Sequence, residues 1–115
     1  MPTKRKPTTV NHTASDLGDD LRITKTTRRA AGAGVWVIGT IADHRFDALC
    51  FPGHAECPDY ELGDSRISKL WLQRLSDKKC VANFDRGWDI RPTTKIATAI
   101  IDYLAAGLAE HVYNK

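Results

Sequence analysis

The chain has 115 residues, 42% of them hydrophobic and 8% aromatic, which fits one globular domain and excludes a fibrous or low-complexity protein. Its formal net charge of +3 equals the charge of Lys4, Arg5 and Lys6, and three such charges supply only a weak, salt-sensitive attraction to a polyanion. Three cysteines are an odd number, and no apolar run is long enough for a signal peptide or a membrane span, so we expect a cytoplasmic protein with reduced thiols and no membrane partner.

The sequence divides into a tail and one domain. Residues 1–20 hold few large apolar side chains and cannot repay the entropy of ordering them, so we predict a disordered basic tail followed by a single domain over residues 21–115. Residues 21–28 alternate and are rich in β-branched side chains, which predicts a charged edge strand. Residues 30–34 predict a flexible turn.

Residues 35–42 and 45–51 predict a hairpin whose turn is Asp43-His44. One face of this hairpin is the predicted core. The other is apolar only at the end away from the turn, so its side chains need cover from another element, a partner chain or a ligand: Trp36, Ile38, Leu49 and Phe51.

Residues 52–65 show neither the helical nor the strand spacing of apolar residues, which predicts a loop. Loops of this length are often functional. A second hairpin is predicted over residues 67–75 and 79–84, with its turn near Asp77-Lys78. In that register Trp71 and Phe84 would form a cross-strand aromatic pair on one face.

The last predicted element is a helix that starts after Pro92-Thr93-Thr94 and carries apolar residues at helical spacing: Ile96, Ile100, Tyr103, Leu104, Gly107, Leu108 and Val112. The expected fold class is therefore α+β, with a meander-type antiparallel sheet of about five strands and one C-terminal helix packed on it.

The stretch from Asn83 to Asp89 combines two acids, an arginine, a glycine and a tryptophan. Arg86 could fork onto a phosphate or carboxylate, and Trp88 could stack on a base or anchor a protein. The structural alternative is that Asp85 and Asp89 pair with neighbouring arginines while Trp88 packs under the helix.

Zinc ligand types occur at Cys50, His54, Cys57 and Cys80. The spacing lacks a paired Cys-x2-Cys motif, so free thiols and a surface histidine are the simpler interpretation, and we expect no metal or other cofactor. No nucleophile elbow, phosphate loop or metalloprotease helix occurs, and we do not expect an enzyme.

Basic side chains surround an aromatic one in the second hairpin: Arg66, Lys69, Trp71, Arg74, Lys78 and Lys79. On a sheet face this pattern can hold single-stranded nucleic acid by stacking and phosphate contact. The alternative is an ordinary solvated hairpin.

Two segments, residues 65–72 (SRISKLWL) and 81–89 (VANFDRGWD), resemble a family of short uncharacterised domains found in bacteria and their mobile elements. The resemblance covers about Trp36 to Leu104. It implies that the turn at residues 86–89 belongs to a shared framework, and it implies no activity.

The sequence thus favours a non-enzymatic binding or accessory module with nucleic acid or a protein as partner. The binding residues would be Arg86, Trp88, Asp85, Asp89, Lys69 and Arg74. The alternatives are a self-assembling homodimer, joined through the apolar patch of the first hairpin, and a small zinc protein or enzyme.

Overall fold

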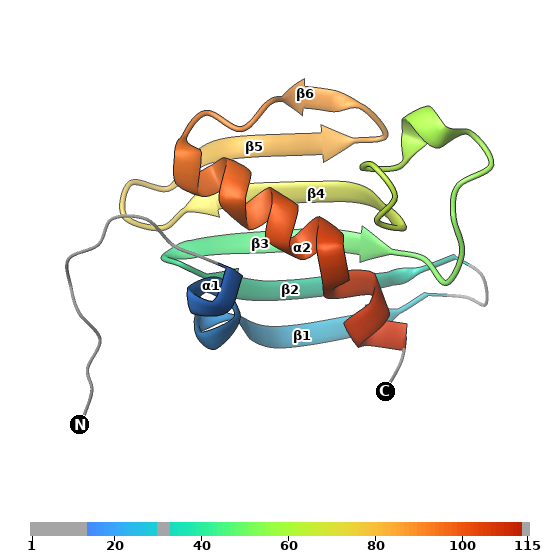
Figure 1. Ribbon diagram of the computed structural model, residues 1–115, viewed down its shortest axis with the longest axis horizontal. Coiled ribbons are helices and arrows are strands. Elements are labelled where there is room, and N and C mark those ends of the chain that lie inside the picture. The colour runs from blue at the N-terminus through green and yellow to red at the C-terminus, as the bar shows by residue number, and fades with distance from the viewer. Residues whose placement is uncertain (1–13, 30–32, 114–115) are drawn as a thin grey trace.

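A computed structural model describes residues 14–29 and 33–113 of the chain. Six antiparallel strands form one sheet in the order of the sequence, β1 to β6, as Figure 1 shows. The strands are β1 (Arg22–Arg28), β2 (Val35–Ile41), β3 (His44–Cys50), β4 (Ile67–Arg74), β5 (Lys79–Asp85) and β6 (Trp88–Ile90). The predicted meander and α+β class are confirmed, with β1 at an edge and β6 as one strand more than expected.

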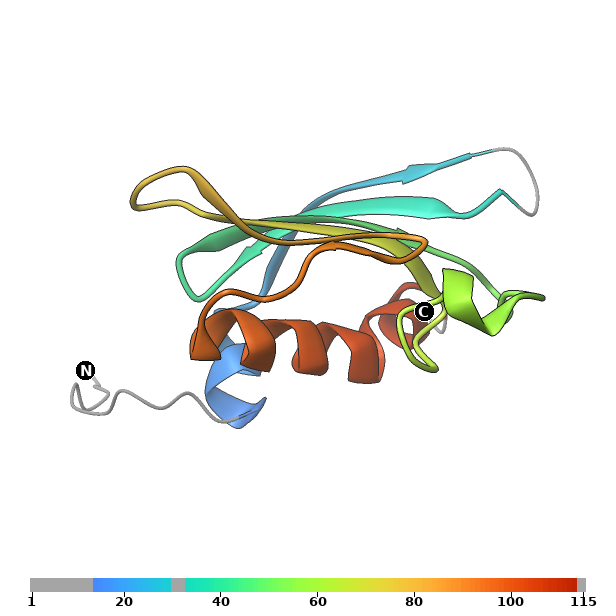
Figure 2. The ribbon, with the colours of Figure 1, turned by 90° about the horizontal axis from the view of Figure 1, so that it is seen from above.

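The helix α2 (Lys95–Tyr113) crosses one face of the sheet and packs on β3 and β4. It begins after Thr94, whose Oγ1 accepts a hydrogen bond from the backbone N–H of Ala97 at 3.0 Å, as an N-cap does. The face toward the sheet carries most of the predicted stripe, including Ile100, Leu104 and Leu108, whereas Gly107 is exposed. Figure 2 shows that both helices lie on the same side of the sheet, so that no described element covers its other side.

The structure corrects the predicted extent of the tail. Residues 14–20, which we expected to be disordered, form α1 (Ala14–Asp20), whereas residues 1–13 lie outside the described part of the chain. Leu17 is buried in the core, and α1 packs against α2 and β2. Burial of one leucine against these elements therefore orders a segment whose own composition predicts no helix.

The first hairpin turns one residue earlier than predicted. Its two turn residues are Ala42 and Asp43, with φ of 51° and 64°, so that His44 becomes the first residue of β3 and is buried. Two positive φ values match the twist of an antiparallel pair, and the Asp20 carboxylate accepts a hydrogen bond from the N–H of Ala42 at 2.6 Å. The assignment of faces along this hairpin is unchanged, because the pairing moves by two residues.

The predicted pairing of Trp71 with Phe84 is wrong. The register of β4 and β5 shifts between Leu72 and Gln73, and Trp71 lies opposite Asn83. A shift by one residue moves a side chain to the other face of a sheet. Phe84 therefore joins the core beneath α2, while Trp71 lies on the uncovered face.

Among the described residues, no helix is both long and apolar enough to cross a membrane.

Candidate functional site

The uncovered side of the sheet, called here the outer face, carries three rows of side chains that run across the strands. The strand registers place Arg22, Thr40, Arg45 and Gln73 side by side in one row, called here the polar row. The next row holds Lys25, Ile38, Asp47, Trp71 and Asn83, and the third holds Thr27, Trp36, Leu49, Lys69 and Asp85. The residues that alternate with these rows form the core, because side chains along a strand point to opposite faces.

Two tryptophans are half-buried on the outer face. Trp36 on β2 and Trp71 on β4 line a shallow depression of about 180 Å³ together with Asp47, Lys69 and Asn83. The guanidinium carbon of Arg45 lies 5.9 Å from the centroid of the Trp71 ring, a cation–π distance. The outer face thus offers two indole rings that line one depression, with a guanidinium beside the ring of Trp71.

The outer face carries more basic than acidic side chains. Arg45 donates from Nε to Asp47 Oδ1 at 3.0 Å, and Lys69 Nζ lies 3.5 Å from Asp85 Oδ1. Arg22 and Lys25 add two cations from the exposed strand β1. Four basic and two acidic side chains therefore share this face of the described sheet.

The turn after β5 consists of Arg86 and Gly87, with φ of 55° and 143°. Trp88 begins β6 and packs edge-on against the core residue Phe84, with ring centroids 5.2 Å apart. The guanidinium of Arg86 lies 5.6 Å from the ring centroid of Tyr60, which is exposed on the 3-10 helix η1 (Pro58–Tyr60). Trp88 thus stabilises the framework, and Arg86 faces the loop over residues 51–66.

The candidate binding residues do not form one cluster. Lys69 and Asp85 share the outer face, whereas Arg86 lies beside Tyr60 and Trp88 packs on the core. Asp89 is exposed on β6. Arg74 is at the other end of β4, where it donates two hydrogen bonds to Asp77 at 3.0 and 2.8 Å.

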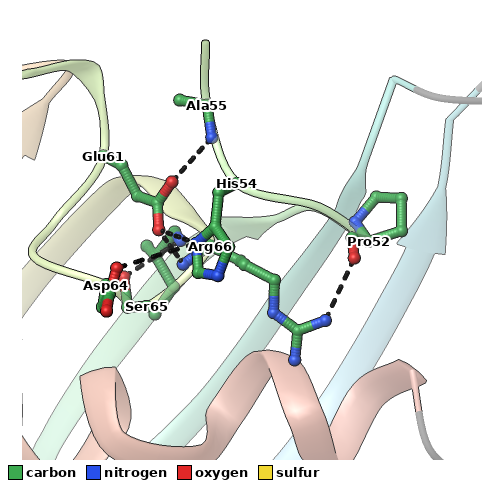
Figure 3. Close-up of polar contacts among 8 residues, drawn as sticks. Pro52, His54, Ala55, Glu61, Asp64, Ser65 and Arg66 are labelled. Atoms are coloured by element: carbon green, nitrogen blue, oxygen red, sulfur yellow. Dashed lines mark hydrogen bonds and ion pairs between the residues drawn. The ribbon is translucent and has the colours of Figure 1, made fainter. Parts of the chain in front are cut away.

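The long loop between β3 and β4 is fixed by one buried carboxylate. Glu61 accepts hydrogen bonds from the backbone N–H groups of Ala55 at 2.7 Å and Arg66 at 2.8 Å, and its Oε2 lies 2.7 Å from His54 Nδ1 (Figure 3). The side chain of Glu61 is only 4% exposed. Since an ionised carboxylate only accepts hydrogen bonds, His54 carries its proton on Nδ1 in this arrangement.

Hydrogen bonding outweighs burial at Glu61. Burial by itself would raise the pKa of this carboxyl, but the hydrogen bonds from His54, Ala55 and Arg66 favour the charged form and leave the pKa below its ordinary value of 4.5. The carboxylate is therefore ionised at neutral pH. Asp64 approaches the same ring, with Oδ1 3.9 Å from His54 Nδ1, and its side chain is fully exposed.

A pocket of about 220 Å³ lies between this loop and the turn after β5. Its lining includes Phe51, Tyr60, Arg66, Ser68 and Arg86. The guanidinium of Arg66 donates to the carbonyl oxygen of Pro52 at 3.1 Å, as Figure 3 shows, and points away from Asp64. Two arginines thus border a pocket whose wall is largely apolar.

The four zinc ligand candidates do not assemble. Cys50 is buried in the core beneath α2, where burial raises the pKa of its thiol to about 12. Cys57 is exposed on the loop, and Cys80 lies at the far end of the sheet, opposite Gln73. Of the four, only His54 belongs to a group of metal-ligand side chains in the described residues, and its companions are Glu61 and Asp64.

Sequence reasoning did not find Glu61, Asp64 or Tyr60. The only local signal was a loop with several acids and one histidine, and nothing in that pattern distinguishes the buried carboxylate from exposed ones. Trp36 was assigned to the right face, whereas Trp71 was paired with the wrong residue on β5.

Residues 35–109 match the model of a family described as a domain of unknown function, DUF7678. No curated protein and no solved structure matches the chain.

Proposed function

The chain belongs to the DUF7678 family, which has no assigned function, and from the geometry of this chain we propose that it binds single-stranded nucleic acid on its outer face. The observation that carries the proposal is the pair of tryptophans on a sheet face that no other described element covers. Aromatic rings on an open sheet give unpaired bases a surface on which to stack.

The polar row supplies contacts for the sugar–phosphate backbone. Arg22, Thr40, Arg45 and Gln73 are hydrogen-bond donors that lie next to the row of Trp71. Lys69 lies in the row of Trp36, on the other side of Trp71 from the polar row. A strand that stacks its bases on the indoles would therefore have donors on both sides of Trp71 for its phosphates.

Several features favour a single strand over a duplex. Stacking on Trp71 and Trp36 requires bases that are not already stacked and paired. The basic excess of the outer face is small, and a duplex binder usually needs many phosphate contacts. Recognition by stacking also tolerates different bases, so we expect weak sequence preference.

The test is fluorescence anisotropy with labelled oligo-dT, oligo-U and a duplex, at low and physiological salt. Trp71→Leu should weaken binding of the single strands by about five- to 150-fold, because stacking on one aromatic side chain contributes about 1–3 kcal/mol. Lys69→Ala should weaken it by a smaller factor and reduce the salt dependence. The matched control is Lys95→Ala, which removes an exposed lysine from the start of α2 on the opposite side.

The proposal fails if the oligonucleotides do not bind at low salt, or if Trp71→Leu and Lys69→Ala bind like the unchanged protein. A preference for the duplex would also contradict it. Circular dichroism of each variant shows whether the fold is retained, so that loss of binding can be separated from loss of structure.

Self-assembly through the same face is a weaker candidate. Of the four side chains first considered for a dimer patch, Leu49 is already buried within the chain, which shrinks the area left for a second copy. Light scattering at high concentration distinguishes the two functions, since nucleic-acid binding as proposed requires no dimer.

The proposal also includes a cytoplasmic location, where nucleic acid is present and free thiols stay reduced. We propose in addition that the segments at residues 66–71 and 85–89 are shared motifs of the family and that its members occur in bacteria and their mobile elements.

A further inference from the structure

The loop between β3 and β4 brings three ligand side chains together at a place unrelated to the outer face. His54, Glu61 and Asp64 each offer an atom, and these atoms lie within 4.8 Å of one another. In Figure 3 both carboxylates approach the imidazole of His54, and dashed lines join each of them to its Nδ1. We propose that these three residues bind a divalent transition-metal ion of the zinc class.

The distances are close to those of a metal site. In a tetrahedral zinc site, ligands at 2.0–2.1 Å from the ion lie about 3.3 Å apart. His54 Nδ1 is 2.7 Å from Glu61 Oε2 and 3.9 Å from Asp64 Oδ1. Small side-chain rotations would open the first distance and close the second, and the ion would replace the proton that Nδ1 and Oε2 now share.

The carboxylate of Glu61 is held in a fixed orientation, as the ligands of metal sites are. Two backbone N–H groups fix its carboxylate, and hydrogen bonds of this kind orient the ligands of metal sites. Its ionised state supplies charge that the cation requires, and the nearby guanidinium of Arg66 is directed toward Pro52.

The ligand set selects the class of metal. One imidazole and two carboxylates suit zinc, cobalt and nickel, whereas calcium and magnesium prefer oxygen ligands alone. A polar pocket of about 330 Å³, lined by His54, Asp64 and Arg66 among others, adjoins the cluster. It leaves room for water as the remaining ligand.

A purely structural role of the cluster makes a different prediction. If the cluster is purely structural, the hydrogen bond between His54 and Glu61 fixes the loop without any metal. The side chain of Asp64 is fully exposed and then does not contribute to the stability of the loop. Asp64→Asn therefore distinguishes metal binding from a purely structural role. The substitution leaves the fold unchanged in both cases, but it weakens the binding of added metal only if Asp64 is a ligand.

The experiment is titration of the full untagged chain with Co²⁺, followed by absorption spectroscopy, and with Zn²⁺ in competition. We expect stoichiometric binding with ligand-field bands of nitrogen and oxygen coordination and no thiolate-to-cobalt charge-transfer band. Asp64→Asn should weaken binding by at least about tenfold, and His54→Ala should weaken it further. Cys57→Ser is the matched control in the same loop and should bind like the unchanged protein.

The inference is overturned if Co²⁺ and Zn²⁺ do not bind, if a thiolate band appears and is lost in Cys57→Ser, or if His54→Ala and Asp64→Asn bind as before. None of these results bears on nucleic-acid binding by the outer face, so the two proposals stand or fall separately.

Discussion

The carboxylate of Glu61 should contribute more to the stability of the fold than the exposed side chains of the same loop do. The change that tests this is Glu61→Gln, which keeps the size of the side chain but replaces one acceptor oxygen by an NH₂ donor. At least one of the three donors at this site, the N–H of Ala55, the N–H of Arg66 or the ring of His54, then loses its acceptor. A hydrogen bond to a charged group contributes about 1.5–3 kcal/mol, so we expect the free energy of unfolding to fall by about 2 kcal/mol at neutral pH.

The pH dependence gives a second signature. The pKa of Glu61 is lowered in the folded chain, so its contribution is fully present above the ordinary value of 4.5 and is lost as the pH falls through the folded-state value. The difference in stability between Glu61→Gln and the unchanged protein should therefore shrink as the pH falls below about 4.5.

Urea denaturation at neutral and acidic pH measures both effects, and hydrogen exchange at the amides of Ala55 and Arg66 shows whether the loop opens locally instead of unfolding the domain. The matched control is Glu56→Gln, an exposed acid of the same loop. If Glu61→Gln is as stable as the unchanged protein with both amides still protected, or if its deficit persists in acid, the reasoning is wrong.

Two further predictions concern packing. An added Cβ at Gly39 would approach the carbonyl oxygen of Arg22 and, at 2.8 Å, the Phe46 ring, so Gly39→Ala should lower the free energy of unfolding by about 1–3 kcal/mol in urea denaturation. An added Cβ at Gly107, in the middle of α2, meets nothing within 4 Å, so Gly107→Ala should raise the free energy of unfolding by about 1 kcal/mol. Similar effects at the two glycines would contradict this reasoning. Leu17→Ala should cost about 2–4 kcal/mol because the side chain is buried, and thermal melting should show it; a neutral result would mean that α1 does not contribute to the core.

The sequence predicted the elements with strong periodic patterns. The two central hairpins and α2 are present, and the alternation along β2 assigned its core face correctly, because buried and exposed positions differ most clearly there. The register of β4 and β5 could not be predicted, since the irregularity near Val81 has no signature in composition.

The candidate site was predictable only in part. Its tryptophans and lysine stand out in the sequence, but the face that Trp71 and Lys69 occupy is set by the pairing of β4 with β3, which the sequence pattern does not specify. Glu61 becomes important only because distant backbone amides converge on it, and such convergence is a property of the folded loop. The helix α1 was missed for a similar reason, because it depends on tertiary contacts of Leu17.

The two edge strands of the sheet, β1 and β6, oppose aggregation. An unpaired strand edge is a template on which another chain can add a strand. Here one end is β1, which is rich in basic residues and has an irregular register between Ile23 and Lys25, and the other is β6, which has only three residues and is soon followed by Pro92. Charge, irregularity and shortness all oppose strand addition, so the sheet is expected to resist growth into fibrils even though one of its faces is open.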